Sequence, residues 1–247
     1  MRIESLSLRP KLLLAATSLA LTLIVLELAL TGIGFSDRPL YQFDAIRGYA
    51  YRPGVEEFQD DGEGDVSLIT NRFGFRDRDR SLEKPSGVIR IAVLGDSFMV
   101  ARKIPSENRF TEVMERQLNL EDNDVDGKRF EVLNFGVASY GTGQELLTLR
   151  HVAVRFQPDI VLLAIYPSND VSTNSKKFQP DNARPYFSLH QGELVVDRSF
   201  YRTWKDVFAS AVLPVVDSLR VGQLILGRIS RLSAQRQLKQ RQHKEQK

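Results

Sequence analysis

Residues 88–98, VIRIAVLGDSF, form an apolar, β-branched run that ends at Gly-Asp-Ser. Such a run predicts a strand that is buried on both faces, as the strands of parallel sheets are. Open α/β sheets build their functional sites at the carboxyl ends of these strands. The sequence therefore places Ser97 at a candidate site, and its hydroxyl is the candidate nucleophile.

Strands and helices alternate after this first strand. Apolar runs predict strands at 130–134 and 160–165, and helical spacing predicts helices at about 108–118 and 143–155. Alternation of this kind predicts an α/β fold, in which a parallel sheet is covered by helices on each side. No further strand–helix unit follows residue 170 in the sequence. We therefore expect an incomplete sheet, whose open edge can bind a protein partner.

The composition is that of a folded protein, with 42% hydrophobic and 26% charged residues in a chain of 247. The chain has no cysteine, which excludes disulfides, thiolate catalysis and cysteine-based zinc sites. Its net charge of +3 is uneven, because the end of the chain is basic and the rest is mildly acidic. Residues 231–247 contain no aromatic residue that could stack on a base, so no nucleic-acid partner is expected.

Residues 12–33 form an almost unbroken apolar run, long enough to cross a bilayer as a helix. Arg2, Arg9 and Lys11 precede the run, so the positive-inside rule keeps the amino terminus in the cytoplasm and exports the rest. A cleaved signal peptide is the alternative, although the run is longer than a usual signal core and no Ala-x-Ala site follows it. Glu27 lies inside the run and is a candidate for contact with a partner. We expect a single-pass membrane protein with a periplasmic or extracellular domain.

The sequence divides into successive regions with different roles. These are a cytoplasmic amino terminus (1–11), a transmembrane anchor (12–33), an extended arm that packs on the domain (34–87), an α/β domain (88–233) and a basic polar tail (234–247). The acidic stretch 60–65 lacks the ligand spacing of a calcium loop, so it is expected to be a solvated turn. No metal and no other cofactor are predicted.

Small or polar residues follow each of the predicted strands. Ser97 follows the first strand, Gly136 the second and Asn169 the third. Because parallel strands end at the same edge of a sheet, the three residues are expected to converge. Ser97 offers a hydroxyl and an N–H, Gly136 an unshielded backbone N–H, and Asn169 an amide donor. Acyl transfer needs a nucleophile and N–H donors aimed at the developing oxyanion, so this set predicts a serine hydrolase site.

These residues carry a resemblance to a known family. Gly95-Asp96-Ser97-Phe98, then Gly136, then Asn169-Asp170 resemble the motif blocks of SGNH hydrolases, also called GDSL esterases/lipases, especially membrane-anchored bacterial members. The resemblance extends over roughly residues 71–170. It implies a flavodoxin-like three-layer α/β/α sandwich, with Ser97 as nucleophile and with Gly136 and Asn169 in the oxyanion hole. The implied substrate is an acyl or acetyl ester, such as one on a cell-surface glycan or lipid.

The sequence departs from the family pattern at two places. Pro167 stands where the family usually has glycine, and the family's Asp-x-x-His segment has no counterpart, because none of His151, His190 and His243 follows an Asp by three positions. A serine without this pair is a poor nucleophile. We therefore expect an impaired hydrolase, truncated before the segment that supplies the base. His190 is the best substitute among the three histidines.

Three alternatives to an ester hydrolase remain open at this point. An O-acetyltransferase acting on an extracellular polysaccharide would use the same serine, with a sugar hydroxyl accepting the acyl group. A non-catalytic binding module would keep the pocket without a base. A nucleotide-binding or phospho-acceptor domain would depend on Asp96, but no Gly-rich phosphate loop follows any predicted strand. Asp96 is instead expected to hold its loop by accepting backbone N–H bonds.

Overall fold

The structure is a computed structural model that describes residues 8–59, 66–120, 127–168, 170–180, 183–201, 212 and 215–229. Asn169, the acidic stretch 60–65 and the basic tail 234–247 lie outside these described residues. The chain divides into two compact units. We call Leu40–Val207 the central unit, and Met1–Pro39 together with Phe208–Lys247 the terminal unit.

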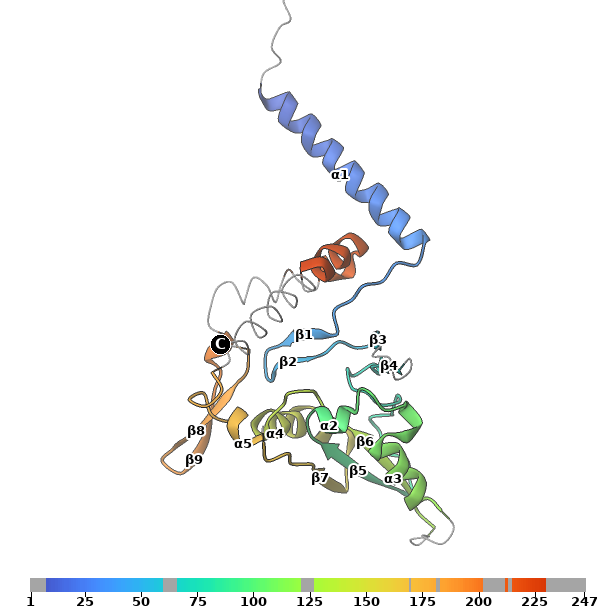
Figure 1. Ribbon diagram of the computed structural model, residues 1–247, viewed down its shortest axis with the longest axis vertical. Coiled ribbons are helices and arrows are strands. Elements are labelled where there is room, and N and C mark those ends of the chain that lie inside the picture. Colours follow the sequence, from blue (N-terminus) through green and yellow to red (C-terminus); the bar gives the residue numbers. More distant parts are fainter. Residues whose placement is uncertain are drawn as a thin grey trace, which may run out of the picture. The chain divides into compact units, whose positions relative to one another are not determined.

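The central unit contains a parallel sheet of three strands in the order β6-β5-β7 (Figure 1). The strands are β5 (Val88–Leu94), β6 (Arg129–Asn134) and β7 (Ile160–Leu163). Val93 of the middle strand pairs with Asn134 on one side and with Leu162 on the other. The three strands therefore end at one edge of the sheet. The mixed α/β class and the three predicted strands are confirmed.

Short helices follow and flank the strands of this sheet. They are α2 (Ser97–Val100), η1 (Ser106–Asn108), α3 (Phe110–Leu118), α4 (Thr142–His151), η3 (Ala153–Phe156) and α5 (Asp170–Thr173). A further short helix, η4 (Ser199–Tyr201), comes later in the central unit. The single helix predicted for 143–155 is divided here into α4 and η3. The chain leaves the α-helical conformation at Val152, with φ −124° and ψ −62°. This turn brings Ala153 and Phe156 into a buried cluster.

Strand β5 is buried on both faces because its alternate side chains enter different hydrophobic clusters. Ile91 and Val93 belong to the cluster that also holds Met114 of α3. Ala92 and Leu94 belong to the other cluster, on the face covered by α4 and η3. Helices thus lie on both faces of this parallel sheet, as its apolar strands require.

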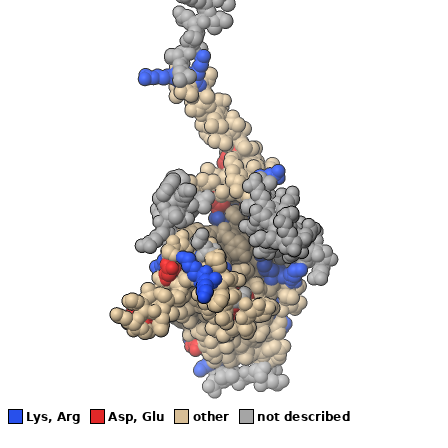
Figure 2. All heavy atoms as spheres, turned by 60° about the vertical axis from the view of Figure 1, so that its left-hand side comes forward, with Lys and Arg blue, Asp and Glu red and all other residues tan. Residues whose placement is uncertain are grey.

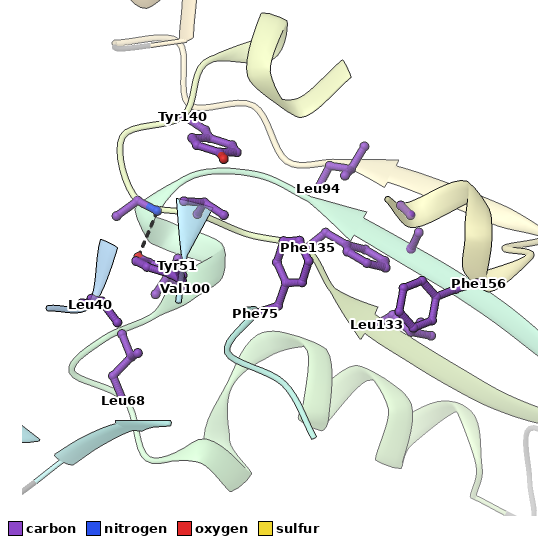
Figure 3. Close-up of a cluster of buried hydrophobic side chains, with 14 of the residues drawn as sticks. Leu40, Tyr51, Leu68, Phe75, Leu94, Val100, Leu133, Phe135, Tyr140 and Phe156 are labelled. Atoms are coloured by element: carbon purple, nitrogen blue, oxygen red, sulfur yellow. Dashed lines mark hydrogen bonds between the residues drawn. The ribbon is translucent and has the colours of Figure 1, made fainter. Parts of the chain in front are cut away.

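The predicted arm forms two antiparallel hairpins. They pair β1 (Tyr41–Asp44) with β2 (Gly48–Tyr51) and β3 (Glu56–Gln59) with β4 (Val66–Ile69). The first hairpin is tied to the loop after β6, because the Ala138 N–H donates to the Tyr51 hydroxyl at 3.1 Å and the Tyr140 hydroxyl donates to the Tyr49 carbonyl. Figure 3 shows Tyr51 in the same buried cluster as Leu94. These contacts join the first hairpin to the loop after β6.

A further antiparallel hairpin follows the sheet. It consists of β8 (Tyr186–His190) and β9 (Glu193–Asp197). The turn residues Gln191 and Gly192 have φ values of 51° and 86°, which is the left-handed pair that a tight hairpin turn requires.

The terminal unit begins with the long helix α1 (Leu8–Gly32). Its segment Arg9–Gly32 has a mean hydropathy of 2.3 and is long and apolar enough to cross a membrane. Figure 2 shows basic side chains at the amino-terminal end of this helix and almost none along its length. The predicted apolar helix is confirmed. In the same unit, residues 215–218 and 220–229 are also helical.

Candidate active site

The candidate nucleophile lies just beyond the carboxyl end of the central strand. Ser97 is the first residue of α2, and its side chain is exposed. Asp96 is buried before it and accepts the Phe98 N–H at 2.9 Å through its Oδ1 atom. Asp96 therefore caps α2 and holds the loop, which is the role expected from the sequence. The serine is presented to solvent while its neighbour is fixed.

The other end of α2 is closed by a buried arginine from the arm. The Arg76 guanidinium donates to the carbonyl oxygens of Val100 and Ala101, and to that of Ile104 at 2.8 Å. Arg76 is only 1% exposed, so these bonds are shielded from water. Four-residue helices leave most carbonyls without intrahelical donors. Arg76 supplies the missing donors and so fixes the element that carries Ser97.

Two glycines mark where the loops after the strands converge on α2. A Cβ atom on Gly95 would lie 2.5 Å from Met99 Cγ and 3.3 Å from the Ala164 Cβ atom, which follows β7. A Cβ atom on Gly136, after β6, would lie 2.7 Å from Met99 Cβ and 3.1 Å from the Val100 nitrogen. Only glycine allows this close approach. The structure therefore brings Gly136 to the helix that begins at Ser97.

The backbone N–H of Gly136 is already engaged. It donates to Asn134 Oδ1 at 2.9 Å, while the Asn134 amide group donates to the Met99 carbonyl at 2.8 Å. Both Gly136 and Asn134 are buried. An oxyanion formed at Ser97 would have to compete with the Asn134 oxygen for this donor. The sequence located the glycine but gave no signal of this hydrogen bond.

The loop after β7 is held next to the candidate nucleophile. The rings of Phe98 and Tyr166 are in contact, with their centroids 4.6 Å apart, and both residues are exposed. The Tyr166 N–H donates to Asp170 Oδ2 at 2.6 Å, so Asp170 holds this loop. Asn169 itself is outside the described residues. Its chain neighbours therefore belong to a loop that contacts α2.

A buried carboxyl group that the sequence analysis did not single out lies near these residues. Glu145 of α4 is 1% exposed, and neither carboxylate oxygen has a hydrogen-bond partner among the described residues. Burial, and then the charges of Asp170 and Asp96, raise the pKa of Glu145 to about 8. Burial also raises the pKa of Asp170, with a further contribution from Asp96. Glu145 is therefore mostly neutral at pH 7 and can hold a proton close to the site.

The histidines do not supply a base to Ser97 in the described residues. His151 is the last residue of α4 and His190 the last residue of β8, and both are exposed. Neither makes a hydrogen bond to Ser97. His243 lies outside the described residues. The same part of the chain contains no group of three or more His, Cys, Asp and Glu side chains that could hold a metal ion.

No protein-family model, curated protein or solved structure matches this chain. The chemistry of the site follows from its own residues. They provide an exposed hydroxyl on a helix fixed at both ends, a glycine loop packed against that helix, an exposed aromatic pair and a neutral buried acid.

Proposed function

We propose that this chain is a membrane-anchored, exported serine ester hydrolase of the SGNH type, with Ser97 as its nucleophile. The observation that carries the proposal is the position of Ser97, which is exposed at the carboxyl end of the middle strand of a parallel sheet. The sheet β6-β5-β7 with its flanking helices would be the motif-bearing part of an SGNH sandwich. The order of the three motif blocks along the sequence supports the same assignment.

In the proposed reaction, the Ser97 oxygen bonds to the ester carbonyl carbon while the serine proton passes to a base. The N–H groups of Ser97 and Gly136 and the Asn169 amide stabilise the oxyanion, and the alcohol leaves with a proton. Water then releases the acid from the acyl-enzyme. Since no described histidine contacts Ser97, we propose slow turnover; sites that lack a triad member keep roughly 10³–10⁴-fold catalysis over water.

The aromatic pair supports a substrate with an apolar or sugar surface. Phe98 is 59% exposed and Tyr166 is 42% exposed, and Phe98 directly follows Ser97 in the chain. Exposed rings next to a nucleophile provide a surface on which an acyl chain or a sugar ring can pack. We propose that this pair lines the substrate site.

A serine-directed fluorophosphonate probe tests the enzyme proposal. We expect the full chain in its membrane to be labelled, and we expect Ser97→Ala to abolish the labelling because the reacting oxygen is removed. Ser188→Ala, which changes an exposed serine on β8, is the matched control and should be labelled like wild type. Equal labelling of wild type and Ser97→Ala would contradict the proposal.

A non-catalytic binding module is the second candidate. Two observations favour it: the Gly136 N–H is engaged by Asn134, and no histidine in the described residues forms a hydrogen bond with Ser97. In that case the probe would label neither protein, and ligand binding would survive Ser97→Ala. The same experiment therefore separates the two candidates.

A further inference from the structure

A side chain of α1 caps the helix formed by residues 220–229. The Glu27 carboxylate accepts the backbone N–H of Arg220 at 2.8 Å and that of Val221 at 2.9 Å, one with each oxygen. The first N–H groups of a helix have no intrahelical acceptor, and a carboxylate at this position satisfies them. Glu27 lies within the apolar segment Arg9–Gly32. The helix therefore starts beside the segment that we propose to cross the membrane.

Two further contacts hold the same helix along its length. The Asp37 N–H donates to Gln223 Oε1 at 3.3 Å, and the Gln223 side chain is fully buried. At Gly227, an added Cβ atom would lie 2.2 Å from Asp37 Oδ2, so the Asp37 carboxylate approaches the helix closely at this glycine. Residues 220–229 thus dock on the chain between Glu27 and Asp37.

The polarity of this helix is the reverse of that of a helix on a water-soluble protein. Successive residues turn by roughly 100° around a helix axis, which separates residues 220–229 into a buried face and an exposed face. The buried positions are Gly222, Gln223 and Gly227, with Leu226 half-buried on the same face, and the exposed positions are Leu224, Ile225, Arg228 and Ile229. A helix in water normally buries its apolar face. Here the fully buried positions are small or polar, and three of the four exposed positions are apolar.

We propose that the helix 220–229 lies in the membrane–water interface, with its apolar face covered by lipid acyl chains. This inference depends on the proposed membrane anchor. Glu27 precedes Gly32 by roughly 7.5 Å of helix rise, at about 1.5 Å per residue. Residues 220 and 221, which Glu27 binds, therefore lie at the depth of the outer turns of α1. That depth exposes Leu224, Ile225 and Ile229 to acyl chains and lets Arg228 reach lipid phosphates.

The proposal also accounts for a carboxylate inside an apolar helix. A carboxylate facing hydrocarbon is costly unless hydrogen-bond donors satisfy it. The N–H groups of Arg220 and Val221 supply two donors to Glu27, and Glu27 in turn satisfies two N–H groups that acyl chains could not. The contact thus lowers the free-energy cost of placing both the Glu27 carboxylate and the two backbone N–H groups next to acyl chains.

Site-specific labels can test the position of the helix, because the chain contains no cysteine. Single variants Ile225→Cys, Leu19→Cys and Ser188→Cys of the full chain would carry a nitroxide in vesicles of phosphatidylcholine and phosphatidylglycerol. Collision with oxygen reports acyl chains, and collision with a water-soluble nickel chelate reports water. We expect the label at 225 to behave like the label at 19 and unlike the label at 188.

Other label behaviour would contradict either the interfacial position of helix 220–229 or the membrane anchor. A label at 225 that collides with the nickel chelate as strongly as the label at 188 would place the helix in water. A label at 225 that collides with neither reagent would mean that protein covers the face. Both results would overturn the proposal. A water-exposed label at 19 would instead overturn the membrane anchor itself, so the two failures are distinguishable.

The capping contact has a test of its own. Glu27→Leu removes the acceptors of the Arg220 and Val221 N–H groups, and we expect amide hydrogen exchange at the start of helix 220–229 to accelerate. Leu26→Ala changes the exposed neighbouring position and is the control. Unchanged exchange in Glu27→Leu would show that Glu27 does not hold this helix in the membrane.

Discussion

Glu145 is buried in α4 without a hydrogen-bond partner among the described residues, next to the charges of Asp96 and Asp170. Its pKa of about 8 in the folded protein lies above 4.5, the ordinary value of a solvated glutamate. The folded state therefore binds a proton that the unfolded state has already lost within this window. Glu145 therefore lowers the free energy of unfolding as pH rises from about 4.5 to about 8.

We expect Glu145→Gln to remove this pH dependence, because an amide does not titrate. The slope removed is at most ~1.4 kcal/mol per pH unit within the window. The measurement is urea unfolding followed by circular dichroism. From pH 5 to pH 8.5, the free energy of unfolding of the variant should increase relative to that of wild type. Glu193→Gln, on the exposed strand β9, should show no such trend. A constant difference for Glu145→Gln would contradict the pKa shift.

The residues at the site differ in how far the sequence could predict them. Ser97 and Gly136 were found because they follow apolar strands. The bond from the Gly136 N–H to Asn134 was not predictable, because it depends on the conformation of one side chain. Glu145 left a weak signal: it lies three positions before Thr148, which is also buried on α4. A charged residue on the buried face of a helix is a reason to examine its environment.

At the scale of elements, α2 depends on a residue from the arm. Replacing Arg76 by Met would leave the buried Val100 carbonyl without this donor and remove a second bond to the partly buried Ile104 carbonyl. We expect Arg76→Met to lower the free energy of unfolding by on the order of 3 kcal/mol. Arg78→Met, which removes a half-exposed ion pair with Glu115, should cost less than about 1 kcal/mol. Similar losses in the two variants, measured by thermal unfolding, would contradict the role of Arg76.

Strand β7 is an edge of the sheet and presents apolar side chains. Ile160, Val161 and Leu163 are each more than 40% exposed, and no strand among the described residues pairs with the outer side of β7. We expect Val161→Lys to reduce self-association of the detergent-solubilised chain in sedimentation velocity, since a charge on an open edge opposes strand pairing. Ser188→Lys on β8 is the control. Unchanged association in Val161→Lys would argue against pairing through this edge.

The elements were predictable where local pattern alone determines them. Strand β5 begins where the predicted apolar run begins and ends before its Gly-Asp-Ser, because this long β-branched run is apolar on both faces. The hairpins β1–β2 and β3–β4 were predicted only as an extended arm, since each strand has four residues. Their position depends on distant contacts such as the one between Tyr51 and Ala138, which are 87 positions apart.

At the scale of the whole molecule, the direction of insertion can be measured directly. We expect a cysteine introduced at Ser188 to react with a membrane-impermeant maleimide in intact cells or spheroplasts, because the central unit is proposed to be exported. A cysteine introduced at Ser5 should react only after the membrane is permeabilised. The reverse pattern would contradict the proposed orientation.

The sequence also predicted the apolar helix α1 but not the chain segment that binds it. Glu27 was a candidate for partner contact, and its partners proved to be backbone groups 193 and 194 positions later in the same chain. Helical spacing alone cannot identify such a pairing, because the receiving groups are main-chain N–H donors that every residue carries.

The contribution of the arm to the core has a practical consequence for protein production. A water-soluble version that starts at Val88 would lack Tyr51, Phe75 and Arg76, all of which are buried in the central unit. Loss of Phe75 would also remove its ring contact with Phe135, in which the two ring centroids are 5.1 Å apart (Figure 3). Expression trials for crystallisation should therefore place the new start codon near Leu40, where the compact central unit begins.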